Sequence, residues 1–190
     1  MEQPKIKRVT EGVQNTKFDC GDEYINNLIK NSYYPSLLNK VCTYEVEVGS
    51  EIIGYCMYCF NEVVVEQFPN DFSGHEYDLE ATGIKKTVTV VHIVFLAIDL
   101  KYQKQGNGEK LLGGLIKLFD DLAKKYPIQA ITLDSKLKLV KWYEKSGFRV
   151  MRTNKKEQAG ITEYMYLTCM DIEQIERYIK KHTEEFDGGE

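Results

Sequence analysis

A six-residue segment, Gln103 to Gly108 (QKQGNG), has the residue types for binding a phosphate group. Its two glycines let the backbone approach a ligand closely, because no β-carbon holds the ligand off. A helix that begins here would leave backbone N–H groups unpaired and would carry the positive end of its dipole at this turn. Such a helix start binds phosphate or pyrophosphate. The segment therefore predicts an anion-binding turn.

An apolar segment and an amphipathic segment flank this turn. Residues 88–98 are apolar except for Thr89 and His92, which predicts a strand covered on both faces. After the turn, apolar residues recur at three- and four-residue spacing and predict a helix with one apolar face: Leu111, Leu112, Leu115, Leu118, Phe119 and Leu122. The predicted order is strand, glycine turn, helix.

This order resembles the acetyl-CoA-binding motif of the GNAT superfamily of N-acetyltransferases, whose signature is Gln/Arg-x-x-Gly-x-Gly/Ala. Downstream, Leu139 to Phe148 (LVKWYEKSGF) resembles the second motif of the family, Tyr-Glu-Lys-x-Gly-Phe. The resemblance implies an acyltransferase with acetyl-CoA as cosubstrate and an amine as acceptor. It also implies an α/β fold with a mixed, mostly antiparallel sheet of about seven strands, flanked by helices and splayed at the coenzyme strand.

The resemblance further implies where the coenzyme binds. Backbone groups at the end of the central strand would hold the pantetheine arm: Leu96, Ala97 and Ile98. The turn and the first helical residues would hold the pyrophosphate: Lys104, Gln105, Gly106, Asn107, Gly108 and Glu109. Many family members carry an asparagine seven residues before the motif tyrosine, where this chain has Lys136. We expect Ser135 or a backbone group to replace the contact of that asparagine with the coenzyme.

Catalytic residues are assigned by the same resemblance. Tyr143 stands where the family commonly places a tyrosine near the coenzyme sulfur, which implies that its phenol protonates the leaving thiolate; alternatively it only fills the apolar face of its helix. His92 stands where the histone-acetylating branch carries a catalytic glutamate, and imidazole accepts protons near neutral pH. The alternatives are a hydrogen-bonded core histidine, a water relay, or Glu45 or Glu47 as the base.

The remaining segments predict one domain over residues 1–190, because 190 residues of which 43% are hydrophobic suit a single core. Residues 41–48 and 52–60 predict a β-hairpin. A first helix is expected to start with Asp19 as its cap and Asp22 in its first turn. Residues 171–190 are expected to form an extra C-terminal helix and an acidic tail.

The acceptor side has no clear motif. Phe18 to Gly21, followed by an apolar helix, resembles the amino-terminal region of a GNAT branch that includes toxin-like transferases acting on aminoacyl-tRNA. The acceptor half is expected to come from the first helices and from loops 66–86 and 154–160. The residues leave open a small-molecule amine, a peptide or protein amine, or aminoacyl-tRNA. A rival function is a catalytically idle CoA-binding or protein-interaction module with the same fold.

Composition restricts the partners. The net charge of −4 argues against nucleic acid as the default partner, although it leaves a local basic patch open. The chain shows no apolar signal core or membrane-length apolar run, which predicts a cytoplasmic protein without a membrane partner. Its five cysteines are odd in number and predict reduced thiols. No metal-ligand cluster is recognisable, so no metal site is expected. Homodimer formation, common in the family, is left open.

Overall fold

The computed structural model describes residues 5–10, 12–13, 17–64, 87–151 and 162–169. The described strands form one seven-stranded sheet in the order β1-β2-β3-β4-β5-β7-β6. Their bounds are β1 (Lys5–Arg8), β2 (Cys42–Val48), β3 (Glu51–Val64), β4 (Thr87–Ile98), β5 (Ala130–Lys136), β6 (Arg149–Val150) and β7 (Thr162–Thr168). The β4–β5 pair is parallel and the other described pairs are antiparallel, which confirms the predicted mixed sheet.

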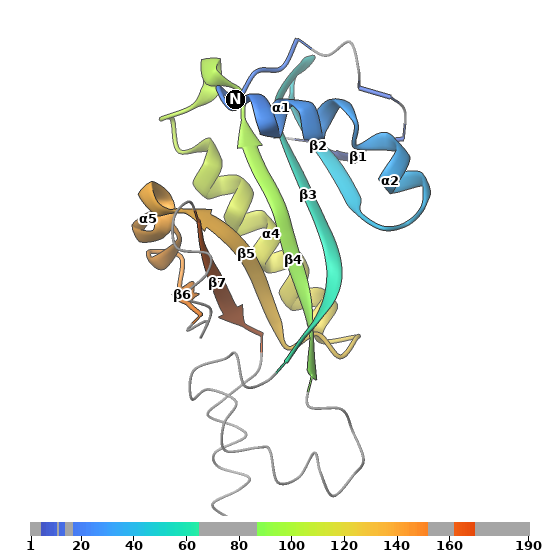
Figure 1. Ribbon diagram of the computed structural model, residues 1–190. Helices are drawn as coiled ribbons and strands as arrows, with labels where there is room; N and C mark the ends of the chain where they lie inside the picture. The colour runs from blue at the N-terminus through green and yellow to red at the C-terminus, as the bar shows by residue number, and fades with distance from the viewer. Residues whose placement is uncertain (1–4, 11, 14–16, 65–86, 152–161, 170–190) are drawn as a thin grey trace, which may run out of the picture.

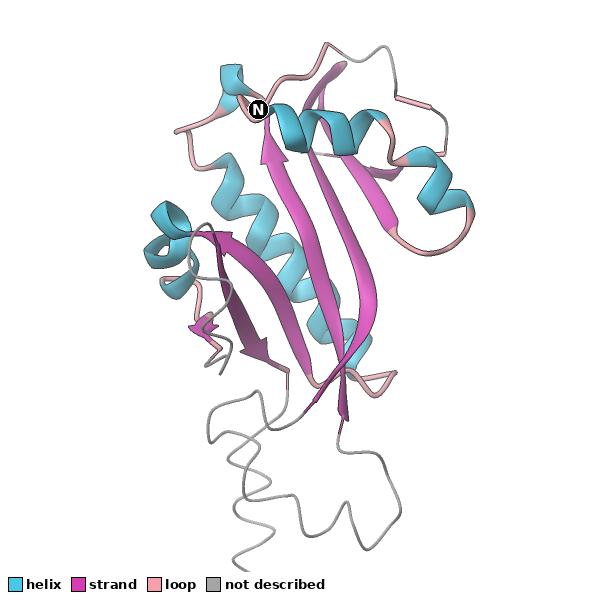
Figure 2. Ribbon diagram, in the orientation of Figure 1, coloured by secondary structure: helices cyan, strands magenta, loops and turns pink. Residues whose placement is uncertain are grey.

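Helices cover both faces of the sheet (Figure 1, Figure 2). One face carries α1 (Glu23–Lys30) and α2 (Tyr33–Leu37), and the opposite face carries α4 (Asn107–Ala123). A short helix, α5 (Val140–Glu144), follows the end of β5. Among the described helices, none combines the length and apolar character needed to cross a membrane. The expected C-terminal helix and tail (171–190) and both expected acceptor loops (66–86 and 154–160) lie outside the described residues.

The apolar stripe of α4 is buried as predicted, with one exception. Leu111, Leu112, Leu115 and Phe119 are buried in the main core, Leu122 is partly buried against it, and Leu118 is exposed. Leu118 lies at one edge of the apolar stripe, where the helix surface turns toward solvent. This packing fixes α4 along the sheet and places its first turn beside the end of β4.

A β-bulge at Val94 changes the direction of the side chains in β4. Met57 of β3 pairs with Phe95 and its neighbour Tyr58 pairs with Ile93, so Val94 has no residue opposite it. Before the bulge, odd-numbered residues pack on the α4 side; after it, Phe95 and Ala97 belong to the core under α1. One extra residue reverses the alternation of a strand. The bulge therefore turns Leu96 and Ile98 toward α4.

The strands β4 and β5 separate after a short paired segment. Their register runs from Val90↔Ala130 to Ile93↔Leu133, yet β4 continues to Ile98 and β5 continues to Lys136. The two ribbons diverge toward α1 and α5 (Figure 1). The last residues of β4 thus have no β5 partner, and their backbone on that edge is left for another group. This confirms the expected splay.

The start of α1 differs from the expectation. Asp22, and not Asp19, is the N-cap: its side chain accepts a hydrogen bond from the Ile25 amide at 3.1 Å. Asp19 instead accepts from the Gly21 amide at 2.8 Å and closes the preceding turn. Gly21 has a positive φ of 76°, which a right-handed helix does not allow, so the helix cannot begin before it.

Candidate active site

A cavity of about 640 Å³ lies where β4 and β5 diverge. Its lining includes the end of β4, the glycine turn, the first turn of α4, the end of β5, α5 and the start of α1. Trp142 and Tyr143 pack in the core on the α4 side, whereas Ile25 and Phe95 pack in the core under α1. The cavity therefore passes between the separated strands and can be reached by groups from both faces of the sheet.

The turn before α4 is open and rich in backbone donors. The first intrahelical bond runs from the Lys110 amide to the Gly106 carbonyl at 3.1 Å, so the amides of Asn107, Gly108 and Glu109 have no intrahelical acceptor. Gly106, the N-cap, has φ of 77°, and a β-carbon added there would meet nothing within 4 Å. Lys104 also has a positive φ, 58°. Such left-handed residues in a turn form concavities that bind anions.

Most of the predicted coenzyme residues lie around this cavity. The lining includes Leu96, Ala97, Ile98, Lys104, Gly106, Gly108 and Glu109, but not Gln105 or Asn107. The side-chain amides of those two residues donate to the carbonyls of Lys101 and Tyr102, each at 2.9 Å. They brace the turn with their side chains while their backbone remains part of it.

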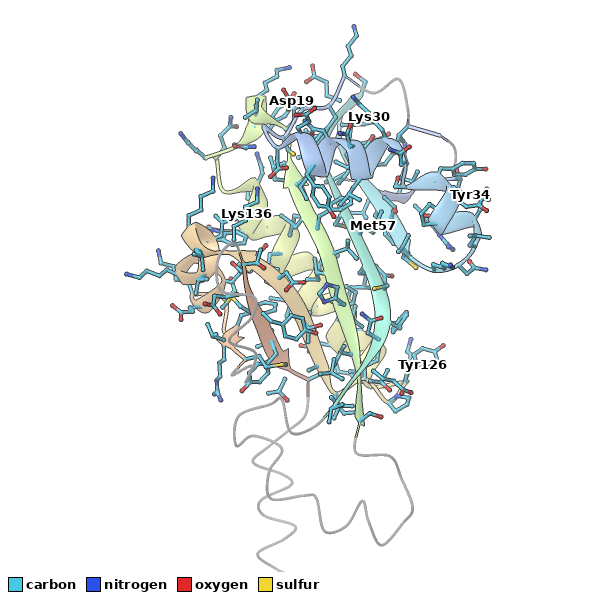
Figure 3. All side chains as sticks on the ribbon, in the orientation of Figure 1. Asp19, Lys30, Tyr34, Met57, Tyr126 and Lys136 are labelled. Carbon is cyan, nitrogen blue, oxygen red and sulfur yellow. The ribbon has the colours of Figure 1, made fainter. Side chains whose placement is uncertain are left out.

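Two further residues that line the cavity, Gln103 and Lys136, make contacts that the sequence did not predict. Gln103, the first residue of the motif, donates from Nε2 to the carbonyls of Cys20 (2.9 Å) and Ile98 (2.8 Å). It ties the segment before α1 to the end of β4. Lys136 lines the cavity and pairs with Asp22, whereas Ser135 is buried, donates to the Lys136 carbonyl and does not line the cavity. Figure 3 shows Lys136 at the end of β5.

Tyr143 faces the cavity from α5. It is 8% exposed, and its ring makes edge contacts with Trp142 and Phe148 at centroid distances of 4.7 and 5.7 Å. Its hydroxyl has no hydrogen-bond partner within the described part of the chain. Burial raises the pKa of Tyr143 to about 12, because the phenolate would lose its hydration. The phenol is therefore protonated at neutral pH and available to a ligand.

His92 does not line the cavity. Its side chain lies on the face of the sheet that also carries α1. Its Nδ1 lies 3.1 Å from Thr132 Oγ1. Its Nε2 lies 3.7 Å from Asp134 Oδ2, and its ring stacks on Tyr164 at 5.9 Å. Burial lowers the pKa of His92, and the Asp134 carboxylate partly opposes that effect.

Asp134 does line the cavity, and sequence reasoning missed it. The parallel register sets His92 beside Thr132, and Asp134 follows two residues later on the same face of β5. The alternation of Thr132, Asp134 and Lys136 was visible in the sequence, but its position beside His92 depends on the register. Glu45 and Glu47 do not line the cavity, because β3 separates their strand from β4.

Comparison with known proteins identifies the family. Residues 47–168 match the family model described as "Acetyltransferase (GNAT) domain". The chain belongs to this family of acyltransferases, as the motifs and the splayed sheet predict, and acetyl-CoA is its cosubstrate. A comparison with curated protein sequences finds no match.

Solved structures with a similar fold include bacterial toxins. A crystal structure of a bacterial toxin superposes with a TM-score of 0.70 at 20% identity, covering 92% of this chain and 97% of that chain. A tyrosine-to-phenylalanine mutant of KacT gives 0.71 at 19% identity, covering 92% and 99%. AtaT complexed with acetyl-methionyl-tRNA gives 0.72 at 18% identity, covering 91% and 99%. At these identities the likeness establishes the fold alone.

Proposed function

We propose that this acetyltransferase transfers the acetyl group from acetyl-CoA directly to a primary amine, with both substrates bound together. The observation that carries the proposal is the cavity between β4 and β5, which is lined from both faces of the sheet. Two reactants that enter from opposite faces meet in line within it, which lowers the entropic cost of reaction. No covalent enzyme intermediate is required.

The residues around the glycine turn fit the coenzyme. The unpaired amides of Asn107, Gly108 and Glu109, the turn residues Gln105 and Gly106, and the Lys104 side chain would bind the pyrophosphate. The β4 edge at Leu96, Ala97 and Ile98, which has no β5 partner, would hold the amide groups of the pantetheine arm, apart from the Ile98 carbonyl, which accepts from Gln103. Bound in this way, acetyl-CoA supplies an activated thioester at the strand gap.

Tyr143 is assigned as the proton donor to the leaving sulfur. Tyr143 lines the cavity, and its hydroxyl is protonated at neutral pH and has no partner among the described residues. A phenol with pKa about 12 is a weak acid, so it acts best as a hydrogen-bond donor while negative charge develops on the thiolate. Such a donor stabilises the transition state more than the bound substrates.

His92 is assigned as the group that finally takes the proton of the amine. Its lowered pKa keeps the imidazole neutral near pH 7, as a base requires. Direct transfer is also favoured by Cys20, the one cysteine among the residues lining the cavity. Burial raises the pKa of the Cys20 thiol, so it is a poor nucleophile for a covalent mechanism.

The acceptor is tested with a panel of amines. Spermidine, amino acids, a short peptide and methionyl-tRNA cover the three classes left open by the sequence. Methionyl-tRNA is included because a similar fold, AtaT, is described in complex with acetyl-methionyl-tRNA. Lys138 at the cavity, which is assigned neither to the pyrophosphate nor to Asp22, offers positive charge near a phosphate-bearing acceptor.

Release of free CoA thiol from acetyl-CoA, followed with a thiol reagent, tests the proposal. We expect release that depends on one class of amine and a mass increase of one acetyl group on that amine. Tight CoA binding without release for any amine would contradict the proposal and would favour a catalytically idle CoA-binding module. Acetyl-enzyme detected by mass spectrometry would contradict direct transfer.

A further inference from the structure

We propose that Asp134 binds the ammonium group of the acceptor and passes its proton to His92. The proposal rests on the proposed function and adds a residue and a charge requirement to it. It starts from the position of Asp134, which lines the cavity and whose carboxylate lies 3.7 Å from His92 Nε2. Three described side chains interact with His92, and of these Asp134 lines the cavity whereas Thr132 and Tyr164 do not.

The charge of Asp134 is available to a substrate. Its side chain is 55% exposed, and within the described part of the chain its ion-pair partner is His92, which is neutral near pH 7. The nearest lysine along β5, Lys136, is engaged by Asp22 at the start of α1. Asp134 therefore presents a carboxylate at the cavity wall to which the ammonium group of an acceptor can bind.

The surroundings of His92 are arranged to receive one proton. Thr132 Oγ1 lies 3.1 Å from His92 Nδ1 and has lone pairs that can accept a hydrogen bond from Nδ1–H. With the proton on Nδ1, the lone pair of Nε2 faces the carboxylate of Asp134, and both groups are hydrogen-bond acceptors. One added proton would form a hydrogen bond between them.

The proton transfer balances without any other reactant. The ammonium of the acceptor gives one proton to the Asp134 carboxylate, which passes it to Nε2 of His92. The products are a neutral amine with a free lone pair, an ionised Asp134 and an imidazolium ion beside it. The restored carboxylate stabilises the imidazolium. The amine lone pair then forms a bond to the acetyl carbon, the bond from that carbon to sulfur breaks, and a second proton of the amine ends on the departing CoA sulfur, to which Tyr143 donates.

The arrangement selects the class of acceptor. A primary amine that is protonated in solution is attracted by Asp134 and deprotonated at the site of attack. A hydroxyl acceptor brings no charge and gains nothing from this carboxylate. We therefore expect cationic amines to be acetylated and alcohols of the same size to be rejected.

Kinetics of Asp134→Asn test the proposal, with Asp120→Asn on the exposed side of α4 as the charge-matched control. The measurement is kcat/KM for the best amine of the panel and Kd for acetyl-CoA. We expect Asp134→Asn to lower kcat/KM about 100-fold, with the loss shared between KM and kcat, and to leave the Kd unchanged. Asp120→Asn is expected to change neither quantity.

An NMR titration of the imidazole groups gives a readout that does not depend on turnover. The chain has three histidines, and His92→Gln assigns the signal of His92. The described groups that face His92 are Asp134 on β5, Tyr164 on β7 and Cys59 on β3. Because Asp134 is the group that raises the pKa of His92, Asp134→Asn should shift the titration of His92 further downward.

The pH profile of kcat/KM gives a second readout. In His92→Gln, kcat/KM should no longer depend on the titration of His92.

The outcomes separate the two proposals. Wild-type protein that acetylates an amine, together with an Asp134→Asn variant that keeps its kcat/KM and its His92 titration, overturns the role of Asp134 alone. Wild-type protein that acetylates no amine overturns the proposed function first. A loss of kcat/KM in Asp134→Asn that an unfolded fraction explains would appear in its circular dichroism spectrum and would count against the proposal.

Discussion

Tyr143 and His92 lie on opposite faces of the sheet, and burial shifts their pKa values in opposite directions. It raises the pKa of Tyr143 to about 12 and lowers the pKa of His92, because burial disfavours the charged form of each group. At neutral pH the phenol keeps its proton and the imidazole has none. These are the starting states that a proton donor and a proton acceptor need.

Replacing Tyr143 with phenylalanine should separate catalysis from binding. We expect kcat to fall about 100-fold, since one proton donor is lost. The Kd for acetyl-CoA should stay within about twofold, and the free energy of unfolding should change by less than about 0.5 kcal/mol, because the hydroxyl has no partner among the described residues. Steady-state kinetics and calorimetry measure these quantities. The control is Tyr126→Phe, at an exposed tyrosine far from the cavity; a weakened Kd in Tyr143→Phe would refute the assigned role.

His92 should make stability depend on pH. Its pKa is lowered from 6.5 in the folded protein, so the unfolded chain binds the proton more readily. The free energy of unfolding should therefore be unaffected well above pH 6.5 and should fall as the pH drops from 6.5 toward the folded pKa. Urea unfolding of wild-type and His92→Gln proteins over this range measures the effect. The variant should lose less stability on acidification; equal slopes would show that the histidine titrates normally.

The first turn of α4 gives a prediction at the scale of an element. Gly106→Ala forces a β-carbon onto a residue with φ of 77° and into the open turn. We expect a loss of about 1 kcal/mol in stability and at least a tenfold weaker Kd for CoA. Gly113→Ala, later in the same helix and outside the cavity lining, is the matched control, because its β-carbon would meet nothing within 4 Å and alanine favours helix. Equal affinities for both variants would argue against phosphate binding at this turn.

The start of α1 depends on Asp22 for two separate interactions. Asp22 caps the helix and pairs with Lys136 across the cavity. Asp22→Ala removes both and should cost about 1 to 2 kcal/mol. Asp22→Asn keeps the cap and weakens only a partly exposed ion pair, so it should cost less than about 1 kcal/mol. Chemical unfolding of both variants tests this order, and the reverse order would show that the ion pair is the stronger interaction.

At the scale of the whole molecule, the sequence predicted those elements whose pattern is long and local. The strand over 88–98, the hairpin and α4 were recovered because each has many residues of one period. The cap of α1 was misplaced by three residues, since Asp19 and Asp22 are equally good capping types. Only the positive φ of Gly21 decides between them.

The features that the sequence could not predict depend on pairing between distant strands. The bulge at Val94 depends on the register of β3 and β4. The approach of Asp134 to His92 depends on the register of β4 and β5. A one-residue change in register would move these side chains to the other face. Tyr143 and the glycine turn could be proposed from the sequence because their motifs are contiguous, whereas the acceptor side is assembled from separate segments.

Backbone NMR during titration with CoA tests the central claim most directly. We predict that the amide signals of Gly106, Asn107, Gly108 and Glu109 shift most, together with those of Leu96 to Ile98, and that 3′,5′-ADP alone reproduces only the shifts at the turn. Saturable binding of CoA that left these amides unshifted, with the largest changes elsewhere in the chain, would contradict the account.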